Sequence, residues 1–233
     1  NIFIGLYFLF ILAPIIWLFT LVVKKQKESL KIEIQQRTNE IQKMTVIQNI
    51  HIERLTRVAT ALSNESHMPV LLEMILDGAK DLTGSDGGTL YLKSSDGKSL
   101  NFHVVKTKSL GISMGGTQGE ITWPSLPLFL EDGSPNKAMV AALCAVSGEL
   151  INIPDVYEAD GFNFEGTKKF DKANNFRSKS MLVIPLKNHE DEIIGVLQLI
   201  NKIDQDGNVV TFCEADKTTS LSLASQAAMA ITN

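Results

Sequence analysis

The sequence predicts an α+β domain, built on an antiparallel sheet of about six strands with helices on its faces, that follows a transmembrane helix and a long coiled-coil helix. Three observations support this order. The 233-residue chain opens on an uncharged apolar run, continues without proline or glycine, and then changes to short strand-like segments joined by turns. The predicted parts are the transmembrane helix 1–23, the coiled-coil helix 24–63 and the globular domain 64–233, whose first helix overlaps 52–63.

The apolar run extends from Ile2 to Val23 and holds 22 uncharged residues. At about 1.5 Å per residue it is long enough for a bilayer core. A buried core helix is the alternative, but such helices rarely lack a polar face over six turns. Lysines follow immediately, so the positive-inside rule predicts a single span of the inner membrane with the rest of the chain in the cytoplasm. The first residue, Asn1, is not Met, and we expect further protein upstream.

The apolar spacing in residues 24–63 predicts a parallel dimeric helix. Alternating spacings of three and four residues connect ten positions, of which seven are apolar, as in a coiled-coil seam. A solitary amphipathic helix lying on the domain is the alternative. Residues 36–40 resemble the linker helices of membrane-bound bacterial sensors. The ten positions are Leu30, Ile34, Arg37, Ile41, Met44, Gln48, His51, Leu55, Val58 and Leu62.

Charge is unevenly distributed along the chain. Residues 1–63 hold eight Lys and Arg against four Asp and Glu, whereas residues 64–233 hold fourteen against twenty-two. The basic part suits an anionic membrane surface, and the acidic part is a poor platform for nucleic acid. The two cysteines, Cys144 and Cys213, form no C-x-x-C pair, and we expect buried, reduced thiols at both.

Within the globular domain, hydrophobic spacing and turn residues define the elements. Ser94 to Gly97 is a hairpin turn, Asn188 to Asp191 is a second turn, and Thr83-Gly84-Ser85 ends the first helix. Strand 193–200 is apolar on both faces except at Gln198, so we expect it to be central and covered on both sides. The predicted helices are 68–82 and 137–146, and the predicted strands are 89–92, 100–105, 150–153, 181–186 and 193–200.

One segment carries a family resemblance. An apolar strand ends in Asn201-Lys202, and Phe212 and Asp216 follow at the spacing of the Asn-Lys-Phe-Asp-Glu signature of GAF domains in cyclic-nucleotide phosphodiesterases. Lys217 stands where that family has Glu. The spacing predicts a clasp in which Lys202, at the strand end, pairs with Asp216 on the next helix while Phe212 fills the gap beneath. We call Asn201, Lys202, Phe212 and Asp216 the signature clasp.

Further stretches resemble the same family in the same order, so the resemblance covers residues 55–233 and implies the GAF fold. Other segments resemble GAF regions that precede HD-GYP phosphodiesterase domains, which hydrolyse cyclic di-GMP. None of the metal centre of those enzymes lies in these residues. The first set comprises residues 148–157, 162–163, 176–182, 184–188 and 223–228, and the second comprises residues 113–117, 127–136 and 188–190.

The resemblance also implies a ligand pocket. Val105 and Lys106 stand where the cyclic-GMP-binding members have a stacking Phe and a base-reading Asp, so we expect weak cyclic-GMP binding. Lys106 favours an anionic small molecule instead. A cyclic nucleotide, another small ligand, or no ligand in a domain that only connects two protomers all stay open. The predicted pocket residues are Val105, Lys106, Ala141 through its backbone, Asn174, Ser178 and Gln198.

The residues show no catalytic constellation. The four histidines form no i, i+4 pair, and no nucleotide-binding or nucleophile motif occurs. We therefore expect a regulatory part of a membrane-anchored bacterial signalling protein, without a cofactor of its own, whose output is an HD-GYP phosphodiesterase. A ligand-free connector to a nucleotide cyclase or histidine kinase is the alternative. A catalytic GAF-fold protein, such as a methionine-sulfoxide reductase, is the rival of a different class.

Overall fold

The computed structural model describes the backbone of residues 2–232 and the side chains of residues 14–50 and 52–232. The chain divides into two compact units, 1–53 and 54–233. The second unit begins inside the segment 52–63, where the sequence predicts that the coiled-coil helix and the first helix of the domain overlap.

The first unit is a single helix. Helix α1 runs from Ile2 to Asn64 and therefore continues into the second unit. Apolar side chains of the predicted seam are exposed on it, including Ile34, Ile41 and Met44, whereas the last predicted seam position, Leu62, is buried in the core of the second unit. Among the residues that the structure describes, no helix is long and apolar enough to cross a membrane, so the predicted transmembrane helix gains no support here. The first part of that predicted span, residues 1–13, lies outside the described side chains.

The second unit is built on one antiparallel sheet with the strand order β3-β2-β1-β7-β6-β5; β4 pairs with β2, and β8 pairs with β7. This confirms the predicted antiparallel α+β fold, with β7 at the centre between β1 and β6. The strands are β1 (Ser85–Lys93), β2 (Ser99–Thr107), β3 (Ile112–Gly115), β4 (Leu126–Pro127), β5 (Ile151–Ile153), β6 (Met181–Lys187), β7 (Ile193–Ile203) and β8 (Val209–Val210).

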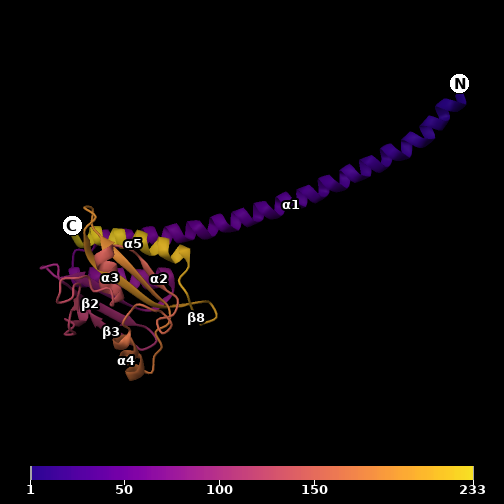
Figure 1. Cartoon of the computed structure of the whole chain (residues 1–233). Coiled ribbons are helices and arrows are strands. Elements are labelled where there is room, and N and C mark those ends of the chain that lie inside the picture. The colour runs from indigo at the N-terminus through magenta and orange to yellow at the C-terminus, as the bar shows by residue number, and fades with distance from the viewer. Residues whose placement is uncertain (1, 233) are drawn as a thin grey trace. The chain divides into compact units, whose positions relative to one another are not determined.

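Helices cover both faces of this sheet, because the central strands β6 and β7 carry apolar side chains on both faces. On one face, helices α2 and α5 and the end of α1 pack on Leu197 and Leu199 of β7. On the other face, α3 packs around Val183 and Val196. Figure 1 shows α2 and α5 close together on the sheet. The helices are α2 (Met68–Thr83), α3 (Val140–Ser147), α4 (Glu165–Asn174) and α5 (Glu214–Thr232), with a 3₁₀ turn η1 (Gly116–Gln118).

The predicted hairpins and the predicted end of α2 are present, and the predicted helix 137–146 is observed as α3. Gly84 and Gly148 end α2 and α3 in the left-handed conformation, which a residue without Cβ adopts at low cost. Sequence analysis missed α4 and the short strands β3, β4 and β8. Helix α4 begins after Phe164, whose side chain makes no capping hydrogen bond, so the usual start signal is weak.

A β-bulge in β2 determines which of its side chains face α3. Leu90 pairs with Val104 and Tyr91 pairs with Phe102, so His103 is the extra residue. An inserted residue reverses the alternation of the strand beyond it. Phe102 and Val105 therefore face the same side, although an uninterrupted strand would place them on opposite faces.

Candidate functional site

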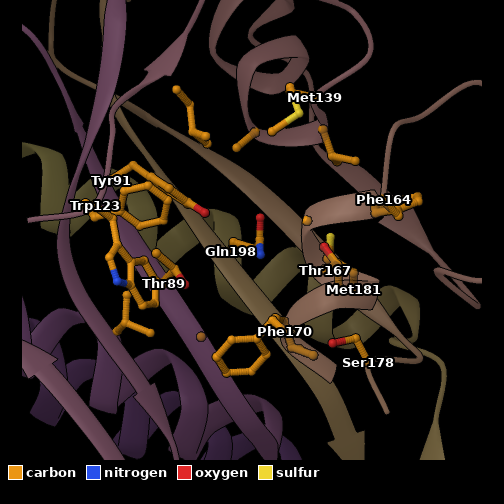
Figure 2. Close-up of a pocket in the computed structure, with 18 of the residues that line it drawn as sticks. Thr89, Tyr91, Trp123, Met139, Phe164, Thr167, Phe170, Ser178, Met181 and Gln198 are labelled. Atoms are coloured by element: carbon orange, nitrogen blue, oxygen red, sulfur yellow. The ribbon is translucent and has the colours of Figure 1, made fainter. Parts of the chain in front are cut away.

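A cavity of about 270 Å³ lies between the sheet, helix α3 and helix α4 (Figure 2). Strands β1, β2, β6 and β7 form its floor. The N-terminal end of α3 and the inner side of α4 form its other walls. Its lining residues are Gly88, Thr89, Tyr91, Phe102, Val105, Thr107, Trp123, Leu126, Met139, Val140, Ala141, Asn163, Phe164, Gly166, Thr167, Phe170, Phe176, Ser178, Met181, Gln198 and Ile200.

Three aromatic rings in contact form one side of the cavity. The ring centroids of Tyr91 and Phe102 are 4.8 Å apart, and those of Phe102 and Trp123 are 5.2 Å apart in an edge-to-face arrangement. Such pairs hold one another in place and leave flat apolar surface for a further ring. In Figure 2, Phe164 lies across the cavity from Tyr91 and Trp123, and Phe170 lies below Gln198. The cavity therefore offers aromatic surface on two sides.

Few polar groups point into this apolar space. In the described part of the chain, the Gln198 side chain has no hydrogen-bond partner, and Figure 2 shows it near the middle of the cavity. The Tyr91 hydroxyl interacts with Thr89. Burial raises the pKa of Tyr91, and the smaller effect of the Thr89 hydrogen bond lowers it, so the hydroxyl stays protonated. These groups can donate and accept hydrogen bonds without carrying charge.

A buried carboxylate attaches α4 to the neighbouring segments that carry Ser178 and Tyr157. Asp171 is almost fully buried and accepts hydrogen bonds from the Ser178 backbone N–H at 2.8 Å and from the Ser178 hydroxyl at 2.9 Å. The Tyr157 hydroxyl donates a third bond at 3.1 Å. The Arg177 guanidinium lies 3.6 Å from the centre of the Tyr157 ring and also pairs with Asp155. This network fixes the wall that carries Thr167 and Phe170.

The structure brings four of the six predicted pocket residues together around the cavity: Val105, Ala141, Ser178 and Gln198. Asn174 is exposed at the end of α4, where its side-chain amide donates to the Phe170 carbonyl at 2.9 Å. Lys106 also lies outside the lining. Its ammonium group pairs with Glu73 at 3.0 Å and with Asp77 at 2.7 Å, both on α2.

The bulge at His103 explains the placement of Lys106. It directs Val105 toward the cavity and the next residue, Lys106, toward α2 on the other face of the sheet. The expectation that Lys106 attracts an anionic ligand in the cavity is therefore corrected, because its charge is already paired with two carboxylates. The aromatic platform missing at position 105 is replaced by rings that sequence reasoning did not select, on Tyr91, Phe102 and Trp123. Tyr91 and Phe102 lie on two of the predicted strands, which is the signal that was available, whereas Trp123 lies in the segment before β4.

The signature clasp is assembled on the last strand and helix. Lys202 forms an ion pair with Asp216, whose carboxylate also accepts the Cys213 backbone N–H at 2.7 Å. Phe212 is buried beneath them in the core. Asn201 adopts a left-handed conformation, and its side chain bonds to the backbone of Lys179 and of Arg177 at 2.7 and 2.8 Å. The clasp therefore ties β7 both to α5 and to the segment after α4.

No metal centre is evident in the described residues, and the two thiols differ in exposure: Cys213 is exposed, which corrects the expectation that it is buried. No group of three or more His, Cys, Asp or Glu side chains among them is placed to hold a metal ion. Cys144 is buried on α3, and burial raises the pKa of its thiol to about 12. Thiolate formation there is strongly disfavoured, which makes Cys144 unsuited to the nucleophilic chemistry of a reductase.

Comparison with known proteins gives the family. The family profile of the GAF domain matches residues 67–231. The dual 3′,5′-cyclic-AMP and -GMP phosphodiesterase 11 of Drosophila melanogaster is 26% identical over 162 residues, which cover 65% of this chain and 10% of that protein. The chain thus spans about a tenth of the length of this relative.

Two solved structures share the fold. The GAF domain from an Acinetobacter phosphoenolpyruvate-protein phosphotransferase has a TM-score of 0.57 at 16% identity and covers 78% of this chain and 93% of its own. The free methionine-R-sulfoxide reductase from Neisseria meningitidis has a TM-score of 0.54 at 16% identity and covers 78% of this chain and 88% of its own. At these identities the likeness concerns the fold. Because the family profile matches most of the chain, the protein belongs to the GAF domain family, and its folded unit is a sensory or regulatory domain of that family.

Proposed function

We propose that this chain is the regulatory part of a membrane-anchored signalling protein, in which a small molecule bound in the cavity between the sheet, α3 and α4 controls an output domain. The presence of this cavity in a GAF domain carries the proposal. Its walls are apolar, and a few polar groups converge on it, as in small-molecule sites generally. Bound ligand would touch Gln198 on β7, whose neighbours Leu197 and Leu199 pack on the opposite face against the helices.

The test is thermal unfolding of the full chain against a panel of small molecules. A compound that binds the folded state raises the unfolding temperature. We expect the increase in the parent chain and in Ala215→Leu, which adds the same bulk at an exposed position of α5. Ala141→Leu narrows the cavity and should abolish the increase in unfolding temperature. An increase that survives in Ala141→Leu would contradict the cavity as the binding site.

The membrane anchor and dimeric helix are part of the proposal. The support is the uncharged run from Ile2 to Val23, the lysines behind it, and the exposed apolar seam of α1. Deleting residues 1–23 should move the protein from the membrane fraction to the supernatant after cell lysis. Retention in the membrane fraction would contradict the anchor.

For the output we propose an HD-GYP phosphodiesterase that hydrolyses cyclic di-GMP, on the resemblance of residues 113–117 and 127–136 to GAF regions of such enzymes. A nucleotide cyclase or histidine kinase is the alternative. Assaying the whole parent protein for cyclic di-GMP hydrolysis decides between them, because only the first output removes that nucleotide. Nucleotide cyclisation or autophosphorylation in place of hydrolysis would favour the alternative.

A further inference from the structure

We infer that the cavity selects an uncharged, flat aromatic molecule that carries an amide-like hydrogen-bonding edge, and that it discriminates against phosphate- and carboxylate-bearing ligands. This inference rests on the proposed function, since it names the class of ligand that the cavity would take. It follows from the charges, rings and polar groups that surround the cavity.

The first step concerns charge. Among the described residues that line the cavity, none is Asp, Glu, Lys, Arg or His. An ion entering it would lose its hydration without meeting a counter-charge, which is strongly unfavourable in apolar surroundings. Lys106 cannot provide one, because it lies on the other face of the sheet and pairs with Glu73 and Asp77.

The N-terminal end of α3 does not change this result. Val140 and Ala141 of its first turn line the cavity, so backbone N–H groups are within reach of an occupant. A helix end supplies only about half an elementary charge, whereas a phosphate or carboxylate brings a full one. Its N–H groups are equally suited to the carbonyl oxygen of a neutral ligand.

The second step concerns shape. Tyr91, Phe102 and Trp123 form one aromatic side, Phe164 lies across from it, and Phe170 also lines the cavity. Flat rings gain most from such surroundings through stacked and edge-to-face contacts. The volume of about 270 Å³ is near the lower limit of ligand sites, which usually measure about 300–1,000 Å³, and favours one or two rings over a dinucleotide.

The third step concerns the hydrogen-bonding edge. Gln198 offers both a carbonyl acceptor and an N–H₂ donor, and the described residues provide no partner for either. A primary or cyclic amide presents the complementary pair of groups. Filling the cavity with a hydrocarbon would leave the Gln198 amide without its hydrogen bonds, which disfavours a purely apolar occupant.

Benzamide and benzoate provide the matched probes, because they share size and shape and differ in charge. The chain has two tryptophans, so the Trp17→Phe form of the full chain, labelled with 5-fluorotryptophan, reports on Trp123 alone by fluorine NMR. We expect benzamide to shift this signal with an affinity at least about tenfold higher than benzoate, cyclic AMP or cyclic GMP. Gln198→Leu, which roughly keeps the side-chain volume and removes the amide, should weaken the binding of benzamide severalfold.

Thr167→Lys places a cation on the α4 wall and should reverse the preference toward benzoate. Thr218→Lys makes the same change at an exposed position of α5 and should leave the preference unaltered. Tighter binding of benzoate or a cyclic nucleotide in the parent chain, seen at Trp123, would overturn the inference while preserving the cavity as a ligand site. Absence of any response at Trp123 to all four probes would overturn the proposed ligand site itself and the inference with it.

Discussion

At the scale of single residues, the most consequential side chains are those that join elements distant in sequence. Lys202 and Asp216 join β7 to α5, and Asp171 joins α4 to Ser178. The family signature identifies the first pair from the sequence. Nothing local marks Asp171, because its partners become visible only when α4 and the following segment fold together.

Asp216→Ala should lower the free energy of unfolding by about 3 kcal/mol, since it leaves the partly buried Lys202 unpaired and removes the acceptor of the Cys213 N–H. Urea unfolding of the full chain measures the change. Glu214→Ala is the control, because it breaks the exposed pair with Lys217 on the same helix and should cost at most about 0.5 kcal/mol. A loss under about 1 kcal/mol in Asp216→Ala would show that the clasp contributes little.

Glu73 should make stability depend on pH. Burial raises the pKa of this carboxyl, but hydrogen bonds from the Thr117 hydroxyl and N–H and from Lys106 outweigh it and lower the pKa from 4.5 to about 2. The folded-state pKa lies below the unfolded one, so the stabilisation is present above pH 4.5 and is lost as pH falls toward 2.

The variant Glu73→Gln lacks this titration. We expect it to be less stable than the parent by about 1–2 kcal/mol at pH 6, with the difference disappearing toward pH 2. Chemical unfolding of both chains across that range is the measurement. Equal pH slopes for the two chains between pH 5 and 2.5 would contradict the assignment of the titration to Glu73.

At the scale of elements, the sequence predicts the long and periodic segments well and the local irregularities poorly. Helix α2, the hairpin at Ser94 to Gly97 and the central position of β7 all follow from hydrophobic spacing and turn residues. The bulge at His103 does not follow from the sequence, because β2 has apolar residues on both faces whether or not a residue is inserted. One inserted residue therefore moves Lys106 out of the cavity and brings Phe102 and Val105 to the same face.

Helix α4 is the other element that sequence reasoning missed, and it carries part of the candidate site. Its only apolar aromatic residue is Phe170, so its period is difficult to detect before its position is known. The spacing of Phe164, Thr167 and Phe170 at three residues is the available signal. Four of the six predicted pocket residues line the cavity, because they lie on β2, β7, α3 and the segment after α4, where the family resemblance fixes the order of elements.

Asp171→Ala should loosen α4 from the segments that carry Tyr157 and Ser178, because it removes the acceptor of three hydrogen bonds in a buried position. We expect hydrogen exchange of residues 165–174 to accelerate by at least about tenfold and stability to fall by about 2–3 kcal/mol. Lys172→Ala, at an exposed position of the same helix, should change neither. Unaltered exchange of α4 in Asp171→Ala would refute this anchoring role.

At the scale of the whole molecule, the two faces of the sheet have different surroundings. One face forms the floor of the cavity, and the other packs against α2, α5 and the end of α1. Side chains of β7 alternate between these faces. An occupant that contacts Gln198 would therefore contact a strand whose neighbouring residues, Leu197 and Leu199, pack against the helices. This is a physical route from the cavity to the helices.

Residues 24–63 should form a parallel dimer in solution, because Leu30, Ile34, Ile41 and Met44 are exposed on a single chain and a second copy would bury them. A chain beginning at Lys24 should sediment as a dimer at tens of micromolar. Ile41→Asp places a charge in the seam and should give a monomer, whereas Gln42→Asp, beside the seam, should not. A monomeric parent at that concentration would contradict the predicted dimer.

The most direct test of the central claim, that an occupant of the cavity is sensed by the helices on the opposite face, is hydrogen–deuterium exchange of the full chain. It compares the empty chain with the chain saturated by the compound that raises its unfolding temperature most. The account predicts slower exchange in 140–147 and 165–174, which border the cavity, and a change in 214–232, which does not. Slower exchange confined to the cavity walls, with α5 unaffected, would contradict it.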